Sequence, residues 1–198
     1  MSNKTKETYN LISKEYDEKT KDYTIQYLKD DLDLFFKNIK GDKILDIGCG
    51  PGRDLQIFKE HGYKAVGIDN SRSMIEICKS KKLNVIEMDI LNIQFENNSF
   101  NAIWAYTSLL HIPKNKFANV LNTIHNLLKE DGIFYIGMKE GDFEGYKTYA
   151  HTDELERFFS LYTKEELEKI LKKKFKIINY SKVSIDNNHY INFLCKKK

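Results

Sequence analysis

A glycine-rich loop that directly follows a short apolar run constrains this 198-residue chain more than any other feature. The apolar run covers residues 43–47, and Gly48, Gly50 and Gly52 follow at every second position. Glycine has no Cβ and tolerates positive φ, so a ligand can lie directly against the backbone of such a loop. A helical pattern then begins at Arg53. A strand, a glycine turn and a helix N-terminus in this order are typical of the nucleotide-binding corner of an open α/β sheet.

Short apolar runs and helical patterns alternate over most of the chain, which predicts a mostly parallel sheet with helices on both faces. The expected elements are, in chain order, helices within 5–36, strand 43–47, helix 53–61, strand 64–68, helix 72–81, strand 83–88, strand 101–106, helix 114–129 and strand 132–138.

The last sixty residues follow a different pattern. Residues 140–162 are polar and lack a clear period, so we expect a long loop there. Thr163 and Glu166 form a capping box that opens a helix to about residue 173. Strands at 175–183 and 189–195 are expected to pair as a hairpin, because the Asp-Asn-Asn turn between them suits one.

The length predicts a single domain over residues 1–198, with a helical segment at 1–40, a core at 41–139, the loop at 140–162 and a helix and hairpin at 163–198. The net charge is only +3, which gives no electrostatic case for nucleic acid as a partner. Cys49, Cys78 and Cys195 lack the spacing of a zinc site or a disulfide framework, so a reducing cytoplasm is expected. We expect neither a signal peptide nor a membrane span.

Three carboxylates narrow the choice of nucleotide. A dinucleotide fingerprint would need glycine at position 53, and a phosphate-binding P-loop would need lysine there, so Arg53 excludes both. Asp46, Asp69 and Asp89 stand at successive strand ends, and the carboxyl ends of parallel strands line one crevice. Such a cluster suits a ligand with cationic centres and sugar hydroxyls. Each aspartate alone could instead be a helix N-cap.

Residues 46–52, 67–71 and 88–90 resemble the cofactor motifs of class I S-adenosylmethionine-dependent methyltransferases. Residues 100–113 and 128–134 are similar to the later strands of that family. Asn101, where the family often has aspartate, and Glu-Asp-Gly at 130–132 depart from the pattern. The resemblance implies a Rossmann-like three-layer αβα sandwich whose seven-stranded, mostly parallel sheet ends in an antiparallel strand, with extra N-terminal helices.

The resemblance also implies S-adenosyl-L-methionine as cofactor, S-adenosyl-L-homocysteine as product, and a role for each motif residue. The backbone of Gly48, Gly50 and Gly52 would approach the methionine and ribose parts. Asp46 would lie near the amino group, and Asp69 would accept the ribose hydroxyls. Around the adenine the expected residues are Asp89 at its amino group, with Asn70, Met74 and Ile90 flanking the ring. The other expected cofactor-site residues are Tyr16, Cys49, Met88 and Tyr106.

Methyl transfer from a sulfonium is a direct displacement, which needs a base only when the acceptor carries a proton. His111 is the candidate base, although a loop histidine that caps the next helix is an equal alternative. Tyr16 is a second catalytic candidate, and no metal site is expected. Residues 1–40 would form a lid, yet Tyr9 and Tyr16 could simply be an aromatic stripe packed on the domain. The expected substrate-side residues are Tyr9, Leu109, His111, Lys139, Glu140, Arg157 and Tyr162, with Tyr146, Tyr149 and Phe158 in the same segment.

These features predict a cytoplasmic methyltransferase, monomeric or homodimeric, that acts on oxygen, nitrogen or sulfur of a small molecule. One alternative is a tRNA or protein methyltransferase, which would show a coherent basic face around the pocket. Another is a protein that binds S-adenosylmethionine as a scaffold without catalysis.

Overall fold

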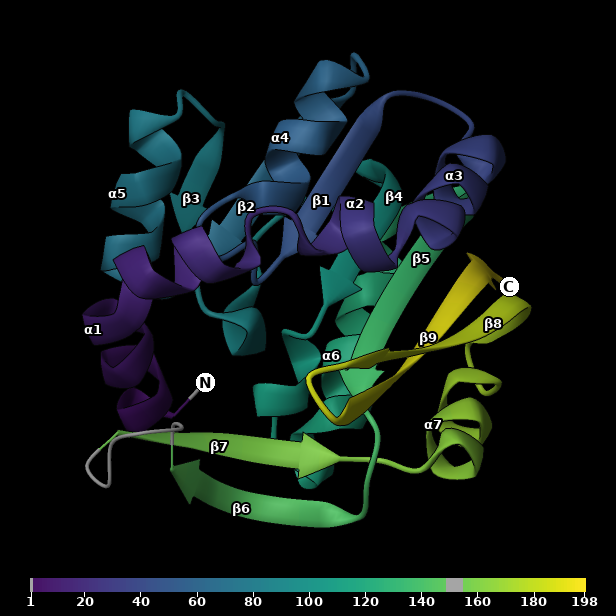
Figure 1. The fold of residues 1–198 in the computed structure, drawn as a ribbon. Helices are drawn as coiled ribbons and strands as arrows, with labels where there is room; N and C mark the ends of the chain where they lie inside the picture. The colour runs from purple at the N-terminus through teal and green to yellow at the C-terminus, as the bar shows by residue number, and fades with distance from the viewer. Residues whose placement is uncertain (1, 149–154) are drawn as a thin grey trace.

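The structure is a computed structural model that describes residues 2–148 and 155–198. Its centre is a seven-stranded sheet in the order β3-β2-β1-β4-β5-β9-β8 (Figure 1). All pairs are parallel except those of β9, which runs antiparallel to both β5 and β8. The strands are β1 Lys43–Ile47, β2 Lys64–Asp69, β3 Val85–Glu87, β4 Phe100–Tyr106, β5 Leu128–Lys139, β8 Phe175–Ile185 and β9 Asn188–Lys197. The expected sheet, with its antiparallel strand, is confirmed.

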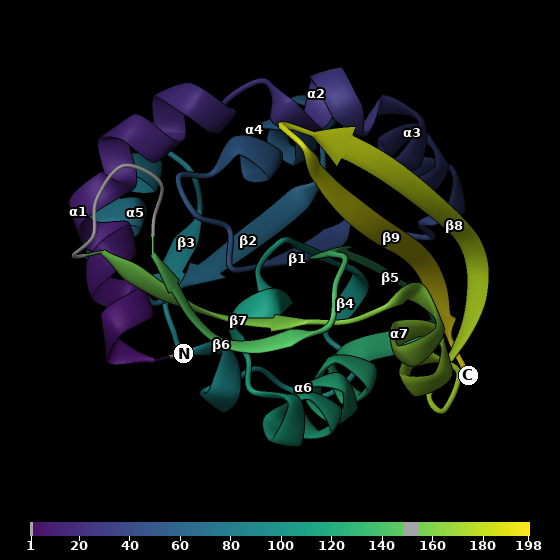
Figure 2. The same ribbon diagram turned by 60° about the horizontal axis from the view of Figure 1, so that its bottom comes forward.

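Helices cover both faces of this sheet and complete the expected three layers (Figures 1 and 2). The α-helices are α1 Asn3–Thr20, α2 Tyr23–Tyr27, α3 Lys29–Asn38, α4 Arg53–Glu60, α5 Arg72–Ser80, α6 Lys114–Leu127 and α7 Lys164–Leu171, with 3₁₀ turns η1 Ile90–Asn92 and η2 Leu109–His111. No helix among the described residues is long and apolar enough to cross a membrane.

Alternate residues of the strands separate two apolar cores, because successive side chains of a strand point to opposite faces. Leu45 and Phe134 pack with α6 and α7 on one face. Ile44 and Trp104 pack with α3 and α4 on the other. The central strands are therefore buried on both sides, which explains why they read as continuous apolar runs.

The N-terminal helical segment is divided into α1, α2 and α3, which wrap around one side of the sheet (Figure 2). On one side, Asp17 of α1 forms an ion pair of 2.6 Å with Lys81, the residue directly after α5. On the other side, the Thr8 hydroxyl donates to the Glu156 carbonyl and the Phe158 backbone N–H donates to the Thr5 hydroxyl. These contacts hold α1 across the carboxyl ends of β1 and β2.

The expectation of a structureless loop at 140–162 is wrong. Strands β6 Phe143–Thr148 and β7 Glu156–Leu161 pair antiparallel in a separate two-stranded sheet, which lies across the open end of the main sheet (Figure 2). Most of their side chains are exposed or half-buried, so the segment lacks the alternation that marks a strand with one buried face. Tyr149, expected on the substrate side, lies outside the described residues.

Candidate active site

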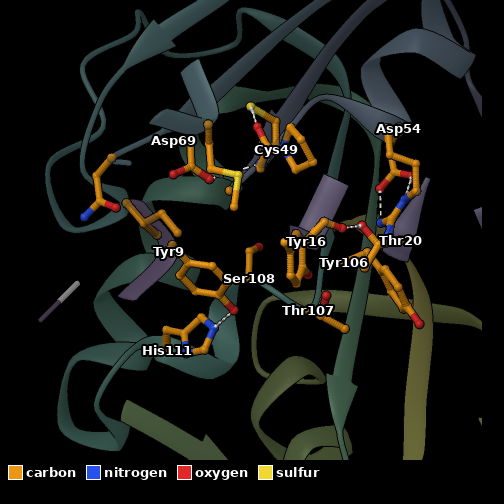
Figure 3. Close-up of a pocket in the computed structure, with 17 residues that line it drawn as sticks. Tyr9, Tyr16, Thr20, Cys49, Asp54, Asp69, Tyr106, Thr107, Ser108 and His111 are labelled. Atoms are coloured by element: carbon orange, nitrogen blue, oxygen red, sulfur yellow. Dashed lines mark hydrogen bonds and ion pairs between the residues drawn. The ribbon is translucent and has the colours of Figure 1, made fainter. Parts of the chain in front are cut away.

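A pocket opens at the carboxyl ends of β1, β2 and β4, beneath α1 (Figure 3). Nine of the thirteen residues expected to contact the cofactor line it: Tyr16, Gly48, Cys49, Gly50, Asp69, Asn70, Met74, Ile90 and Tyr106. They come from α1, the glycine loop, the carboxyl ends of β2 and β4, α5 and η1. The carboxyl edge of a parallel sheet therefore gathers residues that are far apart in sequence.

The three loop glycines all have positive φ, at 70° for Gly48, 53° for Gly50 and 86° for Gly52, but they serve different purposes. A Cβ on Gly48 would lie 2.3 Å from Cβ of Ser108, and one on Gly52 would lie 2.4 Å from Cδ1 of Leu83. A Cβ on Gly50 would meet no protein atom within 4 Å. Gly48 and Gly52 therefore allow close packing of the protein, whereas Gly50 leaves room on the pocket side.

Asp69 ties the glycine loop to α5. Its carboxylate accepts the backbone N–H of Gly50 at 3.0 Å and that of Ser71 at 2.8 Å. Burial raises the pKa of Asp69, and the two backbone donors oppose that rise. The carboxylate thus lies at the pocket wall with its position fixed from two sides.

Three buried polar oxygen atoms at or behind the pocket wall have no hydrogen-bond partner among the described residues: Oδ1 of Asn70 and Oγ of Ser108, which line the pocket, and Oδ2 of Asp46, which lies behind the glycine loop. A buried polar atom without a partner is costly, so such atoms often belong to sites that a ligand completes. Burial, followed by the nearby Asp54, raises the pKa of Asp46 well above its ordinary value. A ligand that brings N–H and O–H donors, or a cation, would satisfy these groups.

Four residues expected to contact the cofactor do not line the pocket: Asp46, Gly52, Met88 and Asp89. Asp46 is buried at the end of β1. The Asp89 carboxylate accepts the backbone N–H of Leu91 at 2.9 Å and so caps η1, the role proposed as the alternative for such aspartates. Met88 accepts the backbone N–H of Gln94 at its sulfur.

Arg53 and Asp54, at the start of α4, line the pocket, although no functional role was expected for either residue. The guanidinium of Arg53 donates two hydrogen bonds of 2.8 Å to Asp54, whose carboxylate also accepts from Trp104 Nε1 at 2.9 Å and from the Thr24 hydroxyl. The pair keeps Arg53 charged, and its guanidinium lies over the Tyr106 ring at 5.5 Å. Only tertiary contacts reveal this arrangement.

His111 and Tyr9 meet at the pocket floor, 102 positions apart in sequence (Figure 3). Nδ1 of His111 donates to the Phe158 carbonyl at 2.6 Å, so Nε2 is the acceptor for the Tyr9 hydroxyl at 2.8 Å. Arg157 Nη1 donates to the same hydroxyl at 3.1 Å. Burial lowers the pKa of His111 to about 3, which holds the imidazole neutral.

A second pocket adjoins the first and shares Tyr9, Tyr16 and Tyr106 with it. Of the expected substrate-side residues, Tyr9, Lys139 and Arg157 line this second pocket, and His111 lines the first. Thr107 lines both pockets, and its φ of 54° is unusual for a β-branched residue. Strain of this kind is concentrated at functional sites.

The remaining substrate-side candidates do not line either pocket. Leu109 is fully buried in the apolar core. Glu140 forms an ion pair of 2.6 Å with Lys182. Tyr162 is buried against Phe117, with ring centroids 5.0 Å apart.

Comparison with known proteins supports this description. Residues 44–132 match the family model of a methyltransferase domain. An uncharacterized protein of Methanocaldococcus jannaschii is 35% identical over 131 residues, which cover 65% of this chain and 49% of the relative. Sterol 24-C-methyltransferase of Saccharomyces cerevisiae is 31% identical over 108 residues, which cover 49% of this chain and 27% of that protein. The chain thus spans half or less of the length of these relatives.

A solved structure shares the fold. The 1,6-didemethyltoxoflavin-N1-methyltransferase of Burkholderia thailandensis, with bound 1,6-didemethyltoxoflavin and S-adenosylhomocysteine, superposes with a TM-score of 0.63 at 23% identity. The superposition covers 80% of this chain and 72% of that one.

Proposed function

This chain belongs to the class I S-adenosylmethionine-dependent methyltransferases, and on that premise we propose that it binds S-adenosylmethionine beneath α1 and methylates a small molecule held in the adjoining pocket. The observation that carries the proposal is the set of unpartnered acceptors on Asp46, Asn70 and Ser108 around a loop whose Gly50 leaves open space. The amino group, ribose hydroxyls and adenine amine of S-adenosylmethionine are the donors that such acceptors need. The residues present therefore fit this cofactor.

Each part of the site has a role in holding the cofactor. Asp46 would hold the amino group, Asp69 the ribose hydroxyls, and Met74 and Ile90 would flank the adenine. Arg53, kept charged by Asp54, supplies a cation for the cofactor carboxylate. The bound cofactor supplies an electrophilic methyl group on its sulfonium.

The protein contributes to the reaction mainly through position. Holding both reactants in line supplies roughly 7–11 kcal/mol of the barrier reduction, without a covalent intermediate. Tyr16, Tyr106 and Thr107 line both pockets and so lie where the methyl group would cross. The neutral imidazole of His111 accepts from the Tyr9 hydroxyl and would thereby orient that hydroxyl at the boundary of the two pockets.

A small acceptor is favoured because residues of α1, β6 and β7 line the second pocket together, next to the first. Known methyltransferases with related sequence or fold act on small molecules, namely a sterol carbon and a nitrogen of 1,6-didemethyltoxoflavin. The three cysteines are free and buried, which fits the cytoplasm that we propose as its location.

Calorimetric titration with S-adenosylhomocysteine tests the cofactor, and we expect Asp69→Ala to weaken binding at least about tenfold. Unchanged affinity in that variant would reject the assignment. A screen of metabolites with S-adenosylmethionine labelled in its methyl group then tests turnover. His111→Ala is expected to lower turnover while the affinity for S-adenosylhomocysteine stays near that of the wild type, and equal turnover would remove His111 from catalysis.

A further inference from the structure

The second pocket carries an excess of positive side chains, which the small net charge of the whole chain does not predict. Arg53 lines both pockets and is paired with Asp54, so it is left out of the comparison. Among the other described residues that line the second pocket, the cations are Lys19, Lys139, Lys147 and Arg157, whereas the acids are Glu15 and Asp186. In the pocket beneath α1, Arg53 neutralises Asp54, which leaves Asp69 as the acid at the wall and Asp46 buried behind the glycine loop. Two adjoining pockets of opposite sign are suited to a cationic donor and an anionic acceptor.

Lys147 and Arg157 face each other directly across the β6–β7 pair. Like charges in opposed positions of an antiparallel pair repel each other, so this arrangement destabilises the β6–β7 pair. Lys139, at the end of β5, brings a third positive charge to the same pocket. Burial, and then Lys147 and Arg157, lower the pKa of Lys139, as expected for cations that repel one another.

The two lysines of this group are not neutralised by the described residues. Neither Lys139 nor Lys147 forms an ion pair within residues 2–148 and 155–198, and the Lys147 ammonium lies over the Phe143 ring at 4.2 Å. Arg157 uses Nη1 on the Tyr9 hydroxyl and so links these cations to the floor of the cofactor pocket. An anion bound by the three side chains would turn their repulsion into attraction.

We propose that the methyl acceptor carries an anionic oxygen group, a carboxylate or a phosphoryl group, which Lys139, Lys147 and Arg157 bind at the entrance to the methyl-transfer site. The identification of this anion as part of the acceptor rests on the proposed function. The two ammonium groups would form charge-assisted hydrogen bonds with such a group, and the guanidinium of Arg157 adds a fixed positive charge beside them.

Binding of inorganic phosphate and of acetate, each titrated into the full chain and followed by amide NMR, tests the proposal. The double variant K139Q/K147Q is expected to weaken binding of the preferred anion at least about tenfold. K173Q/K176Q removes the same charge from exposed positions outside both pockets, and we expect less than about a twofold change. In buffer without either anion, K139Q/K147Q should unfold at a temperature equal to or above that of the wild type, because it relieves repulsion.

Equal anion affinity in the wild type and K139Q/K147Q, or no binding of either anion up to about 0.1 M, would overturn the proposal. Tighter binding of phosphate than of acetate would assign a phosphoryl group, and the reverse order a carboxylate. A separate titration with S-adenosylhomocysteine distinguishes the two hypotheses. If that ligand does not bind but the anion does, the proposed methyl donor is wrong and the anion site stands; the opposite pattern rejects the anion site alone.

Discussion

The absence of any protein atom near a Cβ on Gly50 makes Gly50→Ala the sharpest test of where the cofactor lies. The φ of Gly50 is 53°, in the left-handed region, where an L-residue costs about 1–2 kcal/mol. For a chain of this size, that loss lowers the melting temperature by roughly 2–8 °C. The added methyl group would enter the space assigned to the cofactor, and we expect the Kd for S-adenosylhomocysteine to rise at least about 100-fold, or about 2.8 kcal/mol.

Gly62 offers a matched control. It follows α4, has a φ of 82°, and a Cβ there would also meet nothing within 4 Å. Gly62→Ala should therefore lose similar stability while it keeps its affinity for S-adenosylhomocysteine. Thermal unfolding and calorimetry of both variants measure the two effects separately. If Gly50→Ala binds the ligand as well as Gly62→Ala does, the cofactor does not lie against the glycine loop and the assignment of the first pocket fails.

Three further predictions concern buried polar groups. Asp31→Ala removes the acceptor for the Tyr135 hydroxyl and for two side-chain donors on β8 and β9, so urea denaturation should show a loss of about 3 kcal/mol or more. The pKa of His111 is lowered to about 3 from an ordinary 6.5, so its contribution to stability is complete above pH 6.5 and is lost as the pH falls toward 3. Between pH 7 and pH 5 the wild type should lose about 2 kcal/mol that His111→Gln does not lose, and equal pH dependence in denaturant titrations would refute the buried neutral imidazole. Tyr9→Phe removes the hydroxyl between His111 and Arg157, so kcat should fall at least about tenfold with little change in cofactor affinity, and an unchanged kcat would show that the hydroxyl has no part in turnover.

The central sheet could be predicted from the sequence because each of its elements carries a local signal. The central strands β1, β4 and β5 are largely buried on both faces and read as apolar runs, and α7 begins at the predicted capping box on Thr163. The hairpin turn between β8 and β9 was also predictable, because Asp186 and Asn187 adopt the positive φ values that their side chains tolerate. Local signals of this kind do not depend on distant contacts.

The wall of the site could not be predicted to the same extent, because it depends on contacts between distant residues. The sequence suggested His111 as a free base, yet its imidazole is held between the Tyr9 hydroxyl and the Phe158 carbonyl. Neither hydrogen bond leaves a signal in the sequence near His111, because Tyr9 and Phe158 lie 102 and 47 positions away. Arg53 was visible only as a residue that excluded two other nucleotide motifs, whereas its ion pair with Asp54 gives it a fixed place in both pockets.

The charge of the second pocket is hidden in the sequence for a more specific reason. A net charge of +3 spread over many lysines indicates no binding surface. The concentration of charge arises from the register of β6 and β7, which sets Lys147 opposite Arg157, and from the end of β5, which brings Lys139 beside them. A shift of one residue in that register would turn one side chain to the other face of the hairpin. The pairing of two half-exposed strands therefore makes the charge of this pocket positive. That positive charge is the basis for the anionic acceptor that we propose.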